Sequence, residues 1–388
     1  MISSKTLIAY ILIVSCLLAG CSETEDSAQR PDSRNETFWP IFRGDNNLSG
    51  VADARITGDL SLLWSFQTGA PIVSSAVIAY GSAYSASTDG IIFAIDLEDG
   101  TEKWRFDTKD DIEASPIILD STLYIGTLSG TFLALDAVTG LLQWQQEIDA
   151  DIMGSANWVS LDEGERTIVM VGSYDNVMYA FNAANGDSVW SYQTDYYING
   201  APATDGHAVV FGGCDEMLHI VSVSDGAKIG EVHAGSYIAG SAALVDNRAY
   251  LGHYGGKMVC IDIEAQELVW EYEDEESGAE FFSSPAVGDT HIYIGSRDNY
   301  LHCVDRESGE FVWKFQTRDE IDSSPVLAGD KLVFASTDGR LYLLDSADGT
   351  ELWSYEIGAP ILGSPAVIDG MIVIGAEDGS IYAFGENR

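Results

Sequence analysis

The string AIDLEDGTEKW at residues 94–104 decides the fold, because related strings return five more times along the chain. They are ALDAVTGLLQW (134–144), AFNAANGDSVW (180–190), CIDIEAQELVW (260–270), CVDRESGEFVW (303–313) and LLDSADGTELW (343–353). Each copy reads as a strand end, an Asp or Asn, a tight turn and a second strand that ends in Trp. Five of the six copies place a Gly in the turn, where positive φ favours glycine. The copies therefore predict a recurring pair of antiparallel strands.

Tryptophan marks the period of this repeat, which is about 40 residues. Gly230 stands where one further copy is expected. The tryptophans that follow the period are Trp64, Trp104, Trp144, Trp190, Trp270, Trp313 and Trp353. Together with Gly230 they indicate eight units.

Each unit is expected to contain four antiparallel strands. Upstream of the string lie a short strand around SPAV, a β-rich strand such as YIGS and a turn such as TDG, with no helical period. Such a sheet buries both faces only by stacking on its neighbours; a solenoid is the alternative, but four strands per unit favour a propeller. The last copy lacks its fourth strand, whereas Leu62–Phe66 precedes the first complete unit. We predict an all-β, eight-bladed propeller of four-stranded blades over residues 62–388, closed by an N-terminal strand that completes the last blade.

These strings resemble the tryptophan-docking motif A-x-D-x-x-T-G-x-x-x-W of the pyrroloquinoline-quinone-like (PQQ) β-propeller repeat family, over residues 62–388. The resemblance implies that each Trp packs on the turn of the neighbouring blade. FWPIFRGDNNLSGV at 38–51, within a pre-propeller segment of residues 38–61, also resembles the stretch that precedes such propellers, and its Arg-Gly-Asp triplet reads as chance. Ser222 and Gly230 in blade four and Gln266 in blade five depart from the motif, so two adjacent joints are expected to be weaker.

The N-terminus reads as a targeting segment. Lys5 precedes an apolar run over residues 7–18 that is short for a membrane span, and Leu-Ala-Gly-Cys at 18–21 resembles a bacterial lipobox. We predict a lipoprotein signal peptide at residues 1–20, lipidation at Cys21 and a disordered tether over 21–37; an ordinary secretory signal is the alternative. The expected location is the outer membrane or cell envelope, with the propeller in the periplasm or outside.

The charge balance limits the class of partner. The chain has 61 acidic and 19 basic residues, a net charge of −42, which argues against nucleic acid as a partner and against binding to an anionic membrane surface. The excess of acid suits either a high-salt habitat or a solvated acidic face. Cys214, Cys260 and Cys303 have no metal-ligand spacing, and the last two fall in a repeat position that elsewhere holds Ala, so buried thiols are favoured over a disulfide.

Comparing the copies separates framework from variable positions. An Ile or Phe fills one slot before every inner strand and reads as core. The next slot varies and contains Glu113 and Asp322, which are candidates for the central channel as cation ligands or an acid/base pair; solvated carboxylates are the favoured interpretation.

The loops at one end of the ring carry aromatic residues that the framework does not require. Exposed tyrosines suit protein interfaces, so we predict a partner-binding face there, with inward folding to plug the ring as the alternative. Acidic residues in the same loops suit a basic partner. The predicted face consists of Tyr174, Tyr196, Tyr197, Tyr237, His253 and Tyr254.

Three functions fit this reading, and a protein-binding scaffold is favoured. Among lipid-anchored family members the chain is similar to the propeller lipoproteins of the outer-membrane β-barrel assembly machinery, which implies a β-barrel assembly subunit as partner. A ligand-binding sensor is the second function. The third, a quinoprotein dehydrogenase, is disfavoured because the chain has no Cys-Cys pair and no capping insertions, so neither PQQ nor calcium is expected. No catalytic motif and no metal-spaced histidine cluster is present, so neither a catalytic nor a metal site is predicted.

Overall fold

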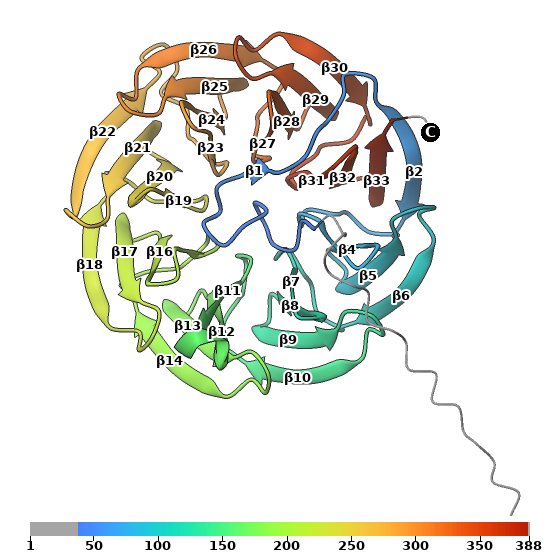
Figure 1. The fold of residues 1–388 in the computed structure, drawn as a ribbon, viewed down its shortest axis with the longest axis vertical. Helices are drawn as coiled ribbons and strands as arrows, with labels where there is room; N and C mark the ends of the chain where they lie inside the picture. Colours follow the sequence, from blue (N-terminus) through green and yellow to red (C-terminus); the bar gives the residue numbers. More distant parts are fainter. Residues whose placement is uncertain (1–37, 387–388) are drawn as a thin grey trace, which may run out of the picture. The chain divides into compact units, whose positions relative to one another are not determined.

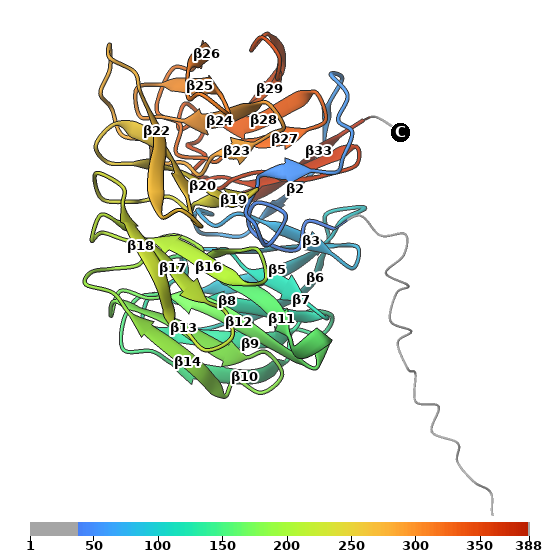
Figure 2. The same ribbon diagram turned by 60° about the vertical axis from the view of Figure 1, so that its left-hand side comes forward.

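A computed structural model describes residues 38–386, so the predicted signal peptide, the lipidated Cys21 and the tether of residues 21–37 lie outside the described residues. Within the described part, strands dominate and the single helix is the short 3-10 turn η1 (Asp162–Gly164). The strands form eight sheets around a ring, seen face-on in Figure 1 and after rotation in Figure 2. The predicted all-β, eight-bladed propeller is therefore confirmed. Nothing helical in residues 38–386 has the length and apolarity that a bilayer crossing requires.

The first four blades are antiparallel sheets whose strands follow chain order from the inside of the ring outward. Blade one contains β3 (Val77–Ala79), β4 (Ser82–Ala86), β5 (Ile91–Asp96) and β6 (Glu102–Asp107). Blade two contains β7 (Ile117–Leu119), β8 (Thr122–Gly126), β9 (Thr131–Asp136) and β10 (Leu142–Glu147). Blade three contains β11 (Asn157–Leu161), β12 (Arg166–Gly172), β13 (Val177–Asn182) and β14 (Ser188–Gln193). Blade four contains β15 (Ala203–Thr204), β16 (Ala208–Gly212), β17 (Met217–Ser222) and β18 (Lys228–His233).

The remaining blades repeat this plan with two additions from the N-terminal part of the chain. Blade five contains β19 (Ala243–Val245), β20 (Arg248–His253), β21 (Lys257–Asp262) and β22 (Glu267–Glu273). Blade six contains β23 (Ala286–Val287), β24 (His291–Gly295), β25 (Tyr300–Asp305) and β26 (Phe311–Gln316). Blade seven contains β27 (Val326–Ala328), β28 (Lys331–Ala335), β29 (Arg340–Asp345) and β30 (Glu351–Glu356), and gains β1 (Val51–Ala52) as a fifth strand. Blade eight contains β31 (Ala366–Ile368), β32 (Met371–Gly375) and β33 (Ser380–Gly385), and is completed by β2 (Ser61–Gln67).

The ring closes where β2 pairs antiparallel with β33, with Trp64 opposite Ala383. This is the closure that the incomplete last repeat predicts, and it leaves no blade with an unfilled fourth position. Figure 1 shows β2 beside β33 at the outer edge, although the two strands lie at opposite ends of the described chain.

The core lies between the blades. The slot predicted as core is buried in every blade: Ile72, Ile112, Ile152, Ile198, Ile238, Phe281, Ile321 and Ile361. In most joints this side chain packs on a glycine of the preceding blade, so that a Cβ on Gly126, for example, would lie 2.2 Å from Ile152 Cγ2. The neighbouring blades cover both faces of the second strand, so β8 is buried throughout. The outermost strand β10 contains only exposed and half-buried residues.

Tryptophan docking between blades is confirmed at six of the seven predicted positions. Each of these indoles packs on the turn glycine of the next blade: Trp64 on Gly100, Trp104 on Gly140, Trp144 on Gly186, Trp190 on Gly226, Trp270 on Gly309 and Trp313 on Gly349. The indole N–H of Trp104 also donates to the Ala137 carbonyl at 2.9 Å in that turn. Trp353 differs because the third and fourth strands of blade eight come from distant parts of the chain and share no turn. Trp353 packs against Phe384 in β33 instead, at 5.6 Å between ring centres.

The departures in blades four and five, expected to affect two adjacent joints, instead meet at one joint. A Cβ on Gly230 would lie 2.4 Å from the Gln266 side chain, so glutamine occupies the space that tryptophan fills elsewhere. The Gln266 amide donates to the Ile229 carbonyl at 3.3 Å. Gln266 keeps the left-handed turn conformation, with φ of 56°, that glycine has in the other copies. The two substitutions compensate each other sterically.

Residues 38–56 follow a path that the repeat pattern does not predict. Figure 1 shows this segment crossing one end of the ring, and its backbone bonds to the inner strands one after another. The bonds join Trp39 to Ile78, Pro40 to Ile118, Asn46 to Thr204, Asn47 to Leu244, Ser49 to Val287, Gly50 to Leu327 and Arg55 to Gly370. The segment thus ties together blades on all sides of the ring, and β1 is its contribution to blade seven.

Arg43 ties the middle of this segment to blades six and seven. Its side chain is 1% exposed and donates to the carbonyls of Pro325 at 2.6 Å and Pro285 at 2.8 Å. Burial lowers the pKa of this guanidinium to about 9, although the charge of Asp45 opposes the shift. Because Arg43 is buried, the Arg-Gly-Asp triplet has a structural role and is not displayed for adhesion.

Candidate protein-binding face

The loops before the inner strands and the turns between the second and third strands lie at the end of the ring opposite residues 38–56; we call this end the loop face. One backbone hydrogen bond recurs there in every blade. In blade three the Tyr174 N–H donates to the Asp151 backbone carbonyl, and in blade five the Tyr254 N–H donates to the Tyr237 backbone carbonyl. The donors form what we call the turn slot: Thr88, Leu128, Tyr174, Cys214, Tyr254, Arg297, Thr337 and Glu377. The variable inner-strand position forms the strand slot: Val73, Glu113, Met153, Asn199, Ala239, Phe282, Asp322 and Leu362.

The predicted tyrosines lie on the loop face of blades three to five, and four of the five are exposed. Tyr196 is 50% and Tyr237 is 49% exposed, and Tyr197 and Tyr254 are also exposed. These four rings therefore do not fold inward to plug the ring. Tyr197 stacks on Tyr174 with ring centres 4.8 Å apart and touches Tyr196 at 4.5 Å. The result is a preformed aromatic surface.

Tyr174 lies half-buried beneath this surface. Burial raises the pKa of its hydroxyl to about 12, and nearby charges, which include Asp151 and Glu113, act in the same direction. Tyr174 is therefore neutral at physiological pH and offers a hydroxyl and a ring face.

His253 does not belong to the exposed face, which corrects the prediction. Strand β20 extends through His253, so its side chain is 2% exposed. Its Nδ1 accepts the Gly255 N–H at 3.0 Å, and its Nε2 has no partner. Burial lowers the pKa of His253, so the imidazole supports the Tyr254 turn as a neutral group.

The two predicted channel carboxylates have different surroundings. Asp322 accepts a bidentate pair from Arg297, at 3.0 Å from Nε and 2.8 Å from Nη2. Glu113 is exposed and makes no ion pair among the described residues. No bond joins the two side chains within residues 38–386, and Asp322 is already neutralised. The arrangement gives no support to an acid/base pair.

Sequence reasoning missed Arg297 and the significance of Phe282. The Arg297 guanidinium lies 3.8 Å from the centre of the Phe282 ring, and Phe282 meets Tyr254 edge-on at 5.3 Å. The repeat alignment contained the signal, because Arg297 is the only cation in the turn slot. Asn199 and Cys214 form another contact between the slots, with Nδ2 3.1 Å from Sγ. Cys260 and Cys303, in contrast, are the buried free thiols that the repeat predicts.

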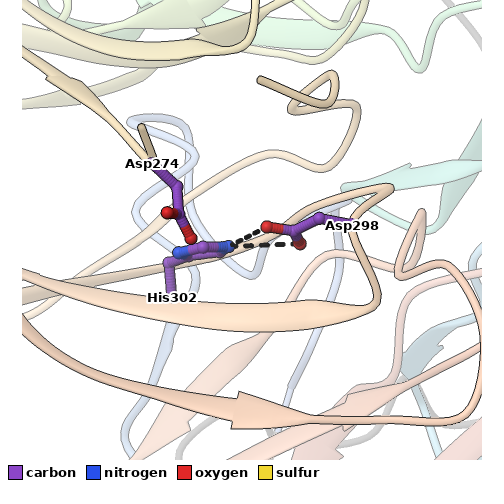
Figure 3. A group of neighbouring side chains, drawn as sticks. All are labelled: Asp274, Asp298 and His302. Carbon is purple, nitrogen blue, oxygen red and sulfur yellow. Dashed lines mark hydrogen bonds and ion pairs between the residues drawn. The ribbon is translucent and has the colours of Figure 1, made fainter. Parts of the chain in front are cut away.

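Asp274, Asp298 and His302 form the one group in the described chain with the spacing of a metal site, and Figure 3 shows the three side chains together. His302 is already fully bonded, since Nε2 lies 3.0 Å from Asp298 Oδ2 and Nδ1 lies 3.0 Å from the Tyr272 hydroxyl. Lys314 Nζ lies 2.7 Å from Asp274 Oδ2 and supplies the positive charge.

The same framework recurs elsewhere in the ring. Asp215 bonds to His219 at 2.9 Å in blade four, and Asp338 bonds to the Tyr342 hydroxyl at 2.5 Å in blade seven. Burial opposes ionisation of Asp298, but the hydrogen bond and charge of His302 outweigh it and lower the pKa of Asp298. These carboxylates fasten the turn to the third strand, and His219 and His302 are buried within their blades.

The residues at the mouth do not fit a quinone and calcium centre of the kind that the family resemblance implies for dehydrogenases. Cys214, Cys260 and Cys303 are not adjacent, and the last two are buried inside blades. Of the strand-slot carboxylates, Asp322 is paired with Arg297 and Glu113 lies in a distant blade. We therefore derive no reaction step from this site.

Comparison with known proteins gives the family. The sequence profile of a family described as outer membrane protein assembly factor BamB matches residues 88–315 and 314–387. No curated protein sequence matches the chain.

Solved structures share the fold. BamB from Moraxella catarrhalis has a TM-score of 0.71 and 22% identity, covering 85% of this chain and 98% of that chain. Quinohemoprotein alcohol dehydrogenase from Comamonas testosteroni has a TM-score of 0.74 and 13% identity, covering 90% and 81%. A europium-containing methanol dehydrogenase also has a TM-score of 0.74 and 13% identity, covering 90% and 98%. At these identities the structural likeness shows the propeller fold alone.

Proposed function

Because the chain belongs to the family described as outer membrane protein assembly factor BamB, we propose that it is a protein-binding scaffold in outer-membrane protein assembly. In this proposal the lipid on Cys21 anchors it to the outer membrane, and the loop face receives a subunit of the assembly machinery. The chain itself performs no catalysis and carries no quinone or calcium.

The exposed aromatic surface of blades three to five carries this proposal. Tyr196, Tyr197, Tyr237 and Tyr254 are large side chains at least 39% exposed in loops that the blade framework leaves free to vary. Tyrosine buries much area at a low cost in side-chain entropy, so a cluster of this kind is suited to a protein partner. The dehydrogenase alternative has the shared fold in its favour, but the mouth residues do not supply its chemistry.

Affinity purification tests the proposal. Tagged full-length protein, extracted from membranes with detergent, is compared with a variant in which Tyr196, Tyr197 and Tyr237 are replaced by Ala. A control variant carries Leu141→Ala, Phe311→Ala and Leu352→Ala, which remove apolar side chains that are 40–68% exposed on outer strands or, for Leu141, directly before one. We expect a barrel-assembly subunit to co-purify with the parent and the control, and to be lost from the tyrosine variant. Equal recovery with all three proteins would reject the loop face as the binding surface.

A further inference from the structure

One part of the loop face already holds a cation between aromatic rings and carboxylates. Arg297 lies over the Phe282 ring, which Tyr254 contacts edge-on, and its guanidinium pairs with Asp322 and lies 3.6 Å from Glu320. Cation–π stacking and paired carboxylates act together on this group. The arrangement shows that a guanidinium fits between the turn slot and the strand slot on the loop face of this propeller.

A second part of the loop face has the same composition without the cation. Tyr174 and Tyr197 are stacked, and Tyr196 lies against Tyr197, so that three aromatic rings and their hydroxyls occur together. The charges of Asp151 and Glu113 reach the Tyr174 hydroxyl. Neither carboxylate makes an ion pair within residues 38–386. Further carboxylates without an ion pair in these loops are Asp111, Asp149 and Asp195.

Residues 38–386 do not supply a cation of their own to this second part. Every described Lys and Arg of blades three to five, and Lys109 in the blade-two loop that holds Glu113, is already in an ion pair: Lys109 with Asp107, Arg166 with Asp162, Lys228 with Glu231, Arg248 with Glu307 and Lys257 with Glu271. Among the described histidines of these blades, His233 pairs with Glu216, and His219 and His253 are buried. His207 is exposed, but it lies in the turn between the first two strands of blade four, at the end of the ring opposite the loop face. The negative potential here is therefore uncompensated.

We propose that the protein partner presents an arginine-bearing segment to the loop face, and that one guanidinium enters beside Tyr174 and Tyr197, where Glu113 and Asp151 neutralise it. This inference rests on the proposed scaffold function and adds the chemistry of the partner. Arginine fits better than lysine because its planar guanidinium stacks on an aromatic ring while its N–H groups bond to carboxylates.

A peptide titration tests the charge preference. Full-length protein in detergent is titrated against a fluorescein-labelled peptide of alternating glycine and arginine, and against the matched peptide with citrulline in place of arginine, by fluorescence anisotropy. The test variant is Glu113→Gln with Asp151→Asn, which keeps side-chain shape and removes two charges. The control is Glu98→Gln with Glu267→Gln, which removes two exposed charges at the opposite end of the ring.

We expect the arginine peptide to bind the parent at least about fivefold more tightly than the citrulline peptide, in keeping with two exposed charge contacts and one stacking contact. The test variant should lose about this factor and the control should not. Equal binding of both peptides, or equal loss in both variants, would overturn the inference.

Co-purification separates this inference from the proposed function. If the test variant still captures the partner at the parent level in low and high salt, the arginine inference is wrong while the scaffold function stands. If the parent captures no partner, the scaffold function fails, and the peptide titration still decides whether the mouth prefers a guanidinium.

Discussion

The joint between blades four and five offers a quantitative test of the packing rule that builds this propeller. Gly230 and Gln266 replace the Trp and Gly found at six other joints, and the glutamine side chain lies where an indole would dock. We consider Gly230→Trp, Gln266→Gly and the double variant, which restores the common pair. If the two positions share one space, the double variant is more stable than the sum of the single changes allows.

The magnitudes follow from contacts at the other joints. A buried Trp removes about 150–250 Å² from water, an upper bound of about 4–6 kcal/mol at about 25 cal/mol per Å². Gly230→Trp alone forces an indole into the Gln266 side chain, and overpacking of this kind costs about 1–3 kcal/mol. Gln266→Gly relieves a positive φ worth about 1 kcal/mol but leaves a gap beside Gly230. We therefore expect a favourable coupling energy of about 2–3 kcal/mol in the double variant.

The assay is equilibrium unfolding in urea, followed by circular dichroism because the added Trp disturbs fluorescence. The matched control reverses the exchange one joint earlier, with Trp190→Gly and Gly226→Gln, where a Cβ on Gly226 lies 2.9 Å from the indole. Its single changes should destabilise and its double variant should recover part of the loss. Additivity within about 0.5 kcal/mol in both cycles would refute the reasoning.

Three further predictions concern buried ionisable side chains. Arg43→Ala should lower the free energy of unfolding by about 2–4 kcal/mol, because two backbone carbonyls lose a charged donor; an unchanged urea midpoint would contradict this. The pKa of His253 is lowered in the folded state, so the unfolded chain takes up a proton at higher pH than the folded chain does, and acidification below about pH 6.5 destabilises the fold. His253→Gln should therefore lose less stability than the parent between about pH 7 and pH 5. An equal loss in both proteins would count against this prediction. The lowered pKa of Asp298 means that its ionised form stabilises the fold above about pH 4 and that this contribution is lost as pH falls through the folded pKa. Asp298→Asn should cost about 1–2 kcal/mol at neutral pH and progressively less as pH falls below about 4; an equal cost at every pH in urea unfolding would contradict this.

The fold could be predicted from the sequence because it is built from repeats. The tryptophan period predicts the number of blades, and the hairpin turns predict four strands in each blade. The incomplete last repeat predicts that an N-terminal strand closes the ring. The path of residues 38–56 was not accessible, because this segment follows no period and bonds to the ring through its backbone. The compensation between Gly230 and Gln266 also needed the structure, which shows that the two departures face each other.

The candidate site could be predicted from the sequence only in part. Aromatic residues outside the repeat framework pointed to the loop face, and four of the six predicted residues are exposed there. His253 was misplaced because β20 continues through it, a difference of one residue that reverses side-chain direction along a strand. Arg297 was overlooked because its role depends on Asp322 in the next blade, and one blade read alone does not show it.

The most direct test of the scaffold function is site-specific photo-crosslinking in living cells. A photoreactive phenylalanine analogue replaces Tyr196 on the loop face or, as a control, Ala184 in an exposed turn at the opposite end of blade three. We expect one discrete crosslinked product at Tyr196 that contains a β-barrel assembly subunit, and none at Ala184. No product at Tyr196, or the same product at both positions, would contradict the proposal that the loop face binds a partner.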